Sequence, residues 1–312
     1  MLVALVFVGC SHTSSSDAQL RHQLEGLKGG DSTESGDPRR GATVIEVVTT
    51  HPIIGDLVRF VGGTNVRVRD IVQAGLDPHT YRPTEADVET LSRARLVLRI
   101  DRGLDPWFGA LATKAVSKAT VIDVSAAVPA RMLPNGVTDP YVWHDPANGD
   151  LMVAAITAAL IAADPADAEP FRTVAARLTS RIDAAGVDID RILGPVRGRS
   201  IVTTKATVGW MAARAGITVI GTVVPGSDSR SDLTTAHLTE LRRTIESKDV
   251  KAVFGESTMP PGAAEGLAHD ANVAFVGGPD ALLGDTLGLA GGGADTYVTA
   301  LVHNARELAA HA

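Results

Sequence analysis

Hydrophobic and polar positions in the first half of the chain alternate between two periods. Short apolar runs predict strands at 42–50, 66–72, 96–100 and 120–124. Stretches with apolar residues three or four apart predict helices at 53–61, 84–94 and 104–115. Thr84, followed three residues later by Asp87, is typical of a capping box at a helix start. Strands that alternate with helices indicate a parallel α/β sheet.

A single long stretch of helical period covers residues 165–193, and only Gly186 weakens it. The alternation then begins again, with strands predicted at 200–203, 219–224 and 252–254 and helices at 208–215, 234–247, 263–271 and 296–310. We therefore predict an α/β fold of two βα lobes with parallel sheets, residues 43–164 and 195–312, joined by one long helix at 165–194. Ligands of such sheets bind at the carboxyl ends of the strands, so a ligand cleft is expected between the lobes.

The N-terminus predicts an anchor and a tether. Residues 1–10 are an apolar run ending in Gly9-Cys10, which looks like the end of a bacterial lipoprotein signal with Cys10 as the lipidated residue. No Lys or Arg precedes Cys10, so we expect a truncated signal; the alternative is a buried N-terminal strand with a free thiol. Residues 11–42 are small and polar, which favours a disordered tether. The prediction is an extracytoplasmic chain attached to the cell membrane by lipid.

Composition removes several classes of protein. With 45% hydrophobic and 21% charged residues, the chain can bury substantial cores. Its 29 basic and 36 acidic residues give a net charge of −7 without a basic run, which excludes nucleic-acid binding. Cys10 is the only cysteine, so a cysteine zinc finger and an internal disulfide are excluded. After the N-terminal run, no segment is expected to approach the ~20 apolar residues that span a membrane.

The segment Asp77-Pro78-His79-Thr80-Tyr81-Arg82-Pro83-Thr84 carries the first candidate ligand. Each proline fixes its own φ and restricts the residue before it, so His79 lies on a stiff loop. The loop follows the strand at 66–72, which places His79 near the predicted cleft. A metal-binding imidazole and a capped loop histidine both fit this position.

Further segments occur in a specific order after this loop: 139–146, 203–206, 253–257 and 284–297. Together with 77–84, this set resembles the zinc- and manganese-binding solute-binding proteins of bacterial ABC transporters, the cluster A-I group, over about residues 43–310. The resemblance implies zinc (Zn2+) or manganese (Mn2+) as the transported ligand and an ABC permease as the partner. It also implies a monomer that binds solute and catalyses no reaction.

The resemblance implies four metal-ligand positions, of which this chain keeps two. His79 and Asp285 are retained, whereas Tyr141 and Lys205 stand where the family has a histidine and a histidine or glutamate. A charged ammonium offers no lone pair, and it repels a dication. Tyrosine ligates only when ionised, which its pKa of ~10 disfavours.

The altered site leaves alternatives open for two residues, His144 and Lys205. His144, three residues after Tyr141, either substitutes for the lost ligand or points away. Lys205 has two possible roles. It either lies beside a weak metal site, or it pairs with Asp285 and closes the cleft without metal. In the second case the protein would serve a partner contact or bind another ligand. Glu256 is expected to support the site from behind the ligands, and His51 to be a strand-end polar cap. A cleft lysine can also act as a nucleophile, but no other catalytic motif accompanies it, so no enzyme is predicted.

Overall fold

The computed structural model describes residues 44–226 and 229–312. These residues belong to one compact unit, 43–312. The predictions for the signal, for Cys10 and for the tether at 11–42 lie outside the described residues and stay predictions.

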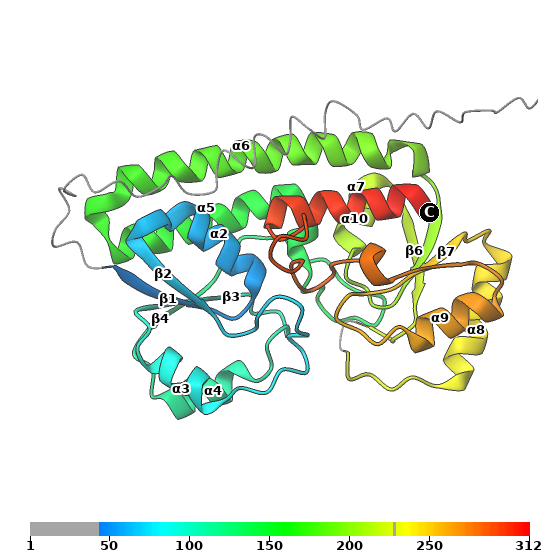
Figure 1. Cartoon of the computed structure of the whole chain (residues 1–312), viewed down its shortest axis with the longest axis horizontal. Helices are drawn as coiled ribbons and strands as arrows, with labels where there is room; N and C mark the ends of the chain where they lie inside the picture. Colours follow the sequence, from blue (N-terminus) through cyan, green and yellow to red (C-terminus); the bar gives the residue numbers. More distant parts are fainter. Residues whose placement is uncertain (1–43, 227–228) are drawn as a thin grey trace, which may run out of the picture. The chain divides into compact units, whose positions relative to one another are not determined.

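The first lobe is built on a parallel sheet of order β2-β1-β3-β4 (Figure 1). Its strands are β1 (Ile45–Thr49), β2 (Val66–Asp70), β3 (Leu96–Arg99) and β4 (Thr120–Asp123). Its helices are α2 (Pro52–Gly62), α3 (Glu85–Ser92) and α4 (Phe108–Ala115). The predicted capping box at the start of α3 is present, because Thr84 Oγ1 accepts from the backbone of Asp87 and the Asp87 carboxylate accepts from the backbone of Thr84.

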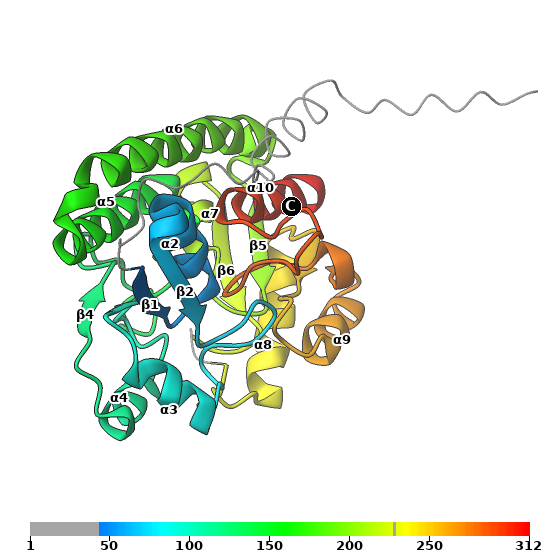
Figure 2. The ribbon, with the colours of Figure 1, turned by 60° about the vertical axis from the view of Figure 1, so that its left-hand side comes forward.

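The second lobe repeats this arrangement with the strand order β6-β5-β7-β8, again all parallel. Figure 2 shows two of these strands, β5 and β6, next to each other. Its strands are β5 (Ser200–Thr203), β6 (Thr218–Thr222), β7 (Ala252–Phe254) and β8 (Ala274–Val276). Its helices are α7 (Gly209–Ala215), α8 (Thr235–Ser247), α9 (Gly262–Asp270) and α10 (Tyr297–His311). The sequence did not predict β8, whose three residues are too few for a period to be recognised.

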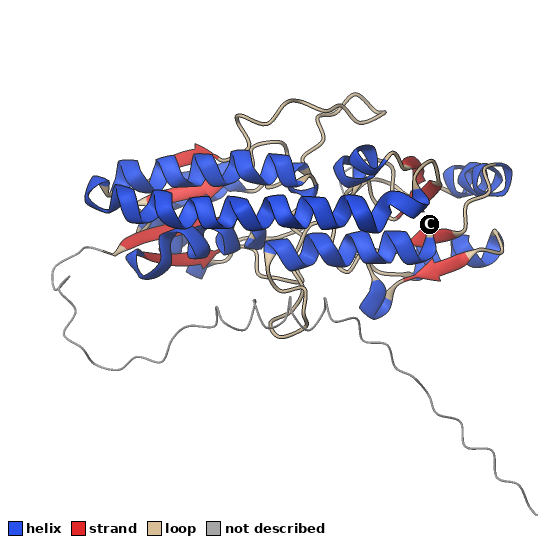
Figure 3. Ribbon diagram, turned by 90° about the horizontal axis from the view of Figure 1, so that it is seen from above, coloured by secondary structure: helices blue, strands red, loops and turns tan. Residues whose placement is uncertain are grey.

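Two helices follow the first sheet and precede the second along the chain, and they pack against each other: α5 (Pro146–Ala163) and α6 (Ala168–Leu193). Helix α6 is the predicted long helix, and it continues through Gly186. Helix α5 was not predicted, although Asp145 caps its first turn and Pro146 occupies a first-turn position. Figure 3 shows α5, α6 and α10 lying side by side.

The expectation that no later segment qualifies as a membrane span was wrong for α5. Its 18 residues are long and apolar enough to cross a membrane by length and composition. Half of that stretch is buried inside the protein, as expected for a helix of the core.

One hydrophobic core extends through both lobes. It includes Ile45 of β1, Ile156 of α5, Ile182 of α6, Ile201 of β5 and Leu308 of α10, all fully buried. Each such side chain contributes roughly 1.5–3 kcal/mol by leaving water. The shared core therefore holds both sheets as one unit, with the carboxyl ends of β1 and β5 available to form a common site.

Candidate functional site

The first strand of each lobe ends in the same local structure. In the first lobe, the Thr49 hydroxyl donates to the carbonyl of His51 at 3.2 Å; in the second, the Thr203 hydroxyl donates to the carbonyl of Lys205 at 2.5 Å. Each strand has a neighbour on both sides, so each turn lies where the strand order reverses, which is the usual ligand position in such sheets. His51 and Lys205 thus occupy equivalent points of the two lobes.

Lys205 and Asp285 form a buried ion pair. Both side chains are 0% exposed, and Lys205 Nζ contacts Asp285 Oδ2. The ammonium also donates to Ser229 Oγ at 3.0 Å, and Thr258 Oγ1 donates to Asp285 Oδ1 at 2.6 Å. Burial is the largest single influence on each group and opposes its charge, but the attractive contacts together outweigh it, with the ion-pair partner first among them. The pKa of Lys205 is therefore raised and the pKa of Asp285 is lowered. Both groups are therefore charged at neutral pH.

His79 lies on its stiff loop against Tyr141. The His79 backbone N–H donates to Asp77 Oδ1 at 2.9 Å, and its Nε2 lies 3.1 Å from the Tyr141 hydroxyl. Both side chains are buried. Burial, and then Asp285, raise the pKa of Tyr141 well above 10, so the phenol keeps its proton. Tyr141 therefore does not provide the ionised phenolate through which a tyrosine binds a metal.

Three side chains bring ligand atoms together: Asp77, His79 and Asp285, whose nearest ligand atoms all lie within 4.8 Å of one another. Two carboxylates and an imidazole are a donor set that zinc and manganese accept. Sequence reasoning missed Asp77, because it assigned that residue to the turn before Pro78. Its position two residues before His79 was the available signal. The residues present thus fit a divalent metal in charge and donor type, with the Lys205 ammonium as the opposing feature.

His144 does not join this group. Its Nε2 donates to the carbonyl of Gly284 at 2.7 Å, and its buried Nδ1 has no hydrogen-bond partner. Burial lowers its pKa to about 4, so the ring is neutral. The suggestion that His144 replaces the lost ligand gains no support from this geometry, because the ring is directed to the backbone of the other lobe.

Residues Gly284–Thr286, which we call the cross-lobe turn, contact three donors of the first lobe. His144 binds the carbonyl of Gly284, His51 Nε2 donates to the carbonyl of Asp285 at 2.9 Å, and the Gly75 N–H donates to the Thr286 hydroxyl at 2.6 Å. Burial lowers the pKa of His51 to about 4 as well. Two neutral imidazoles therefore position the turn that carries Asp285. His51 also caps α2 through Nδ1, as the predicted polar cap would.

Glu256 lies behind the cross-lobe turn. It is 4% exposed; the Thr207 hydroxyl donates to Oε1, and Oε2 has no hydrogen-bond partner. Burial raises its pKa to about 8, although Lys205 acts in the opposite direction. A Cβ on Gly284 would lie 2.0 Å from Oε2, so only glycine fits where the turn passes this carboxyl group.

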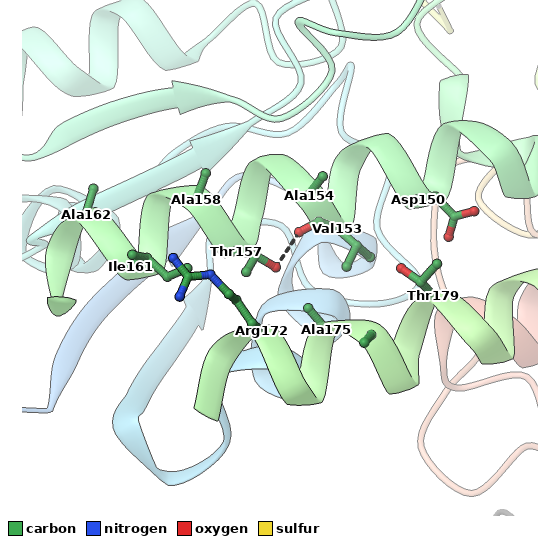
Figure 4. A pocket seen from close by; sticks show the side chains of 11 residues that line it. Asp150, Val153, Ala154, Thr157, Ala158, Ile161, Ala162, Arg172, Ala175 and Thr179 are labelled. Carbon is green, nitrogen blue, oxygen red and sulfur yellow. Dashed lines mark hydrogen bonds between the residues drawn. The ribbon is translucent and has the colours of Figure 1, made fainter. Parts of the chain in front are cut away.

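A hollow of about 620 Å³ lies elsewhere, between α5 and α6. Figure 4 shows its lining, in which five alanines, Val153 and Ile161 are joined by four polar residues, Asp150, Thr157, Arg172 and Thr179. None of the predicted site residues lines it. Its apolar wall and lack of histidine make it unsuitable for a metal ion, so the candidate site remains the group at the cross-lobe turn.

Known proteins of similar sequence and fold bind metals according to their names. The zinc-binding protein TroA of Treponema pallidum is 28% identical over 268 residues, which are 83% of this chain and 85% of TroA. The manganese-binding lipoprotein MntA of Halalkalibacterium halodurans is 26% identical over 307 residues, 97% of this chain and 93% of MntA. The solved structure of periplasmic zinc-binding protein TroA superimposes with a TM-score of 0.78 at 26% identity, covering 85% of this chain and 98% of that one.

A family profile matches most of the chain. The family described as "Zinc-uptake complex component A periplasmic" matches residues 47–311, which include both sheets, α6 and all the residues of the candidate site. The two lobes with parallel sheets and the long helix agree with the TroA fold. The chain therefore belongs to the zinc-uptake complex component A family.

Proposed function

We propose that this chain is the solute-binding component of an ABC uptake system for a divalent transition metal, zinc or manganese. The observation that carries the proposal is the group Asp77, His79 and Asp285, which joins both lobes at a buried site. Family membership and the metal-binding relatives support it. The chain would act by binding and delivering its cargo to a permease, without catalysis.

The donor set defines how the cargo would be held. The carboxylates of Asp77 and Asp285 would offset the charge of the ion, and His79 would supply a neutral nitrogen. Oxygen ligands suit manganese, and imidazole suits zinc, so the set accommodates both. The cost comes from Lys205, since a unit charge ~4 Å from a dication is opposed by about 8 kcal/mol at an effective dielectric of ~20.

Direct titration tests this function. The purified full chain, stripped with a chelator, would be titrated calorimetrically with Zn2+ and with Mn2+, and its bound metal would be quantified. We expect one ion per chain and loss of binding in Asp285→Asn. The matched control is Asp270→Asn, which changes an exposed aspartate of α9. Absence of heat together with absence of stoichiometric metal would refute the proposal.

A second candidate function is favoured by the Lys205–Asp285 ion pair. In it the ammonium takes the place of the cation, and the closed cleft serves a partner contact or another ligand. Lys205→His would then create metal binding that the native chain lacks. If the native chain binds metal tightly and Lys205→His leaves that affinity unchanged, this candidate is wrong.

Membrane attachment through Cys10 and a monomeric state complete the proposal. The lipoprotein relatives support attachment. Cells that express the chain with its native leader would be labelled with a radioactive fatty acid. Label and membrane association should both disappear in Cys10→Ala, and labelling that persists would contradict the assignment. A dimer in gel filtration with light scattering would contradict the monomer.

A further inference from the structure

We propose that Asp77 serves as a metal ligand in this chain, and that Lys205 is an internal cation which the entering metal displaces from Asp285 toward Glu256. This inference rests on the proposed function and deepens it. It assigns a residue to the donor role that Tyr141 and Lys205 do not fill, and it gives the obstructing ammonium a defined second position.

Asp77 is already held in place for this role. Its Oδ1 accepts the backbone N–H of His79 at 2.9 Å, and its Oδ2 accepts the hydroxyl of Thr80 at 3.2 Å. Each carboxylate oxygen has a second lone pair, so these hydrogen bonds leave capacity for a metal. Pro78 between Asp77 and His79 fixes the backbone that joins the two donors. The loop thus presents both ligands with little further loss of conformational freedom.

Burial indicates how an ion would reach the group. Asp77 is half-buried, whereas His79 is 4% exposed and Asp285 is 0% exposed. Asp77 is therefore the one member of the three that solvent reaches readily. A hydrated cation meets this carboxylate first and then loses water as the two buried donors replace it. Asp77 also adds a second negative charge to a donor group whose neighbour Tyr141 is neutral.

Lys205 has a second set of partners close to its present one. Its Nζ donates to Ser229 Oγ at 3.0 Å as well as to Asp285. Glu256 Oε2 lies beside the cross-lobe turn that carries Asp285, since a Cβ on Gly284 would lie 2.0 Å from it. Glu256 Oε2 is buried without a hydrogen-bond partner, which is unfavourable for a polar atom. An ammonium that moves from Asp285 toward Glu256 can keep Ser229 Oγ as an acceptor and gain Oε2 as another, so its N–H groups stay hydrogen-bonded inside the protein.

The test compares metal affinities of single and double variants of the full chain by chelator competition with Zn2+ and Mn2+. Asp77→Asn should weaken binding on the order of a hundredfold, since it removes a charged donor. Lys205→Met should strengthen binding at least about tenfold, since it removes the competing cation. Glu256→Gln should weaken binding in the native background and have no effect in the Lys205→Met background. Controls are Asp270→Asn and Lys118→Met, both at exposed positions.

Two further readouts separate ligation from folding. The visible absorption of bound Co2+ should change in Asp77→Asn, because the number or type of donors changes. Circular dichroism and thermal unfolding should verify that each variant folds; if Lys205→Met does not, Lys205→Gln keeps a donor to Asp285 while removing the charge.

Each outcome decides a separate point. Native affinity and Co2+ spectrum that survive Asp77→Asn overturn the ligand role of Asp77 and leave the proposed function intact. The displacement of Lys205 is overturned if metal affinity does not rise in Lys205→Met. It is also overturned if Glu256→Gln changes affinity equally in the native and Lys205→Met backgrounds. If neither the native chain nor Lys205→Met binds metal, the proposed function itself fails.

Discussion

Replacing Lys205 by methionine should strongly destabilise the metal-free protein. The change removes the ammonium from a site where both partners are 0% exposed. Asp285 keeps the hydrogen bond from Thr258 but loses its only described counter-charge in contact. An uncompensated buried carboxylate remains. Removing one partner of a buried pair typically costs about 3–5 kcal/mol.

This cost can be converted into a melting temperature. A unit of about 270 residues, 43–312, unfolds with an entropy of roughly 0.6 kcal/mol/K at about 2.1 cal/mol/K per residue. A loss of 3–5 kcal/mol therefore lowers the melting temperature by about 5–9 °C.

The loss of stability in Lys205→Met should be larger at neutral and high pH than at low pH. In the native chain the pKa of Asp285 is lowered and that of Lys205 is raised, so the pair stabilises at a constant level between roughly pH 4 and 10. In Lys205→Met the attraction of the ammonium is gone, and burial, the largest influence on Asp285, raises its pKa. The cost then grows as pH rises above the unfolded pKa of about 4, and the gap to the native chain narrows toward pH 4.

The assay is thermal and urea unfolding in the presence of a chelator, at pH 4.5, 7 and 9. The double variant Lys205→Met/Asp285→Leu should recover most of the lost stability, because no charge remains buried. Lys118→Met is the control. A Lys205→Met variant that loses under 1 kcal/mol at pH 7, or loses as much at pH 4.5, would refute the reasoning.

Three other predictions concern groups around the cross-lobe turn. His144→Phe should cost about 1–3 kcal/mol of stability, because the carbonyl of Gly284 loses its donor. The native chain should lose stability as pH falls from 6.5 to 4, because the folded ring has a pKa of about 4 and only the unfolded chain takes up a proton in this range. His144→Phe should make that pH dependence smaller. An unfolding free energy, measured with urea, that falls with pH as steeply in His144→Phe as in the native chain would count against this. The native chain should lose stability as pH rises from 4.5 to 8, the interval between the unfolded and folded pKa values of Glu256, and Glu256→Gln should abolish this fall because glutamine does not ionise. A stability–pH profile of Glu256→Gln identical to the native one would contradict the raised pKa of Glu256. Tyr297→Phe should cost about 1–2 kcal/mol by leaving the carbonyl of Trp143 without its 2.7 Å donor, and unchanged urea midpoints would show that water replaces it.

The fold was largely predictable from local pattern, and its two omissions have physical causes. Strands such as β1 and β5 are buried runs between polar turns, and α6 has one apolar stripe, so their periods are clear. Helix α5 is apolar around most of its circumference, which removes the period that identifies an amphipathic helix. Strand β8 is too short to show any period.

The site was predictable only as far as family motifs reach. His79 was singled out by its stiff loop before the resemblance supported it, Asp285 came from the resemblance alone, and the pairing of Lys205 with Asp285 followed from their charges. The contact between His51 and the carbonyl of Asp285 joins residues 234 apart, and that between His144 and Gly284 joins residues 140 apart. No local pattern specifies such contacts, because they depend on how the lobes meet.

The cross-lobe turn has a consequence for unloading. His51 holds the backbone carbonyl of Asp285, whose carboxylate is a candidate ligand, so the contact between lobes and the coordination of cargo depend on the same residue. Separation of the lobes withdraws Asp285 from Asp77 and His79 in the same motion that breaks the imidazole contacts. Cargo would then leave in one cooperative step, and a permease that pulls the lobes apart would need no separate means of extracting the ion.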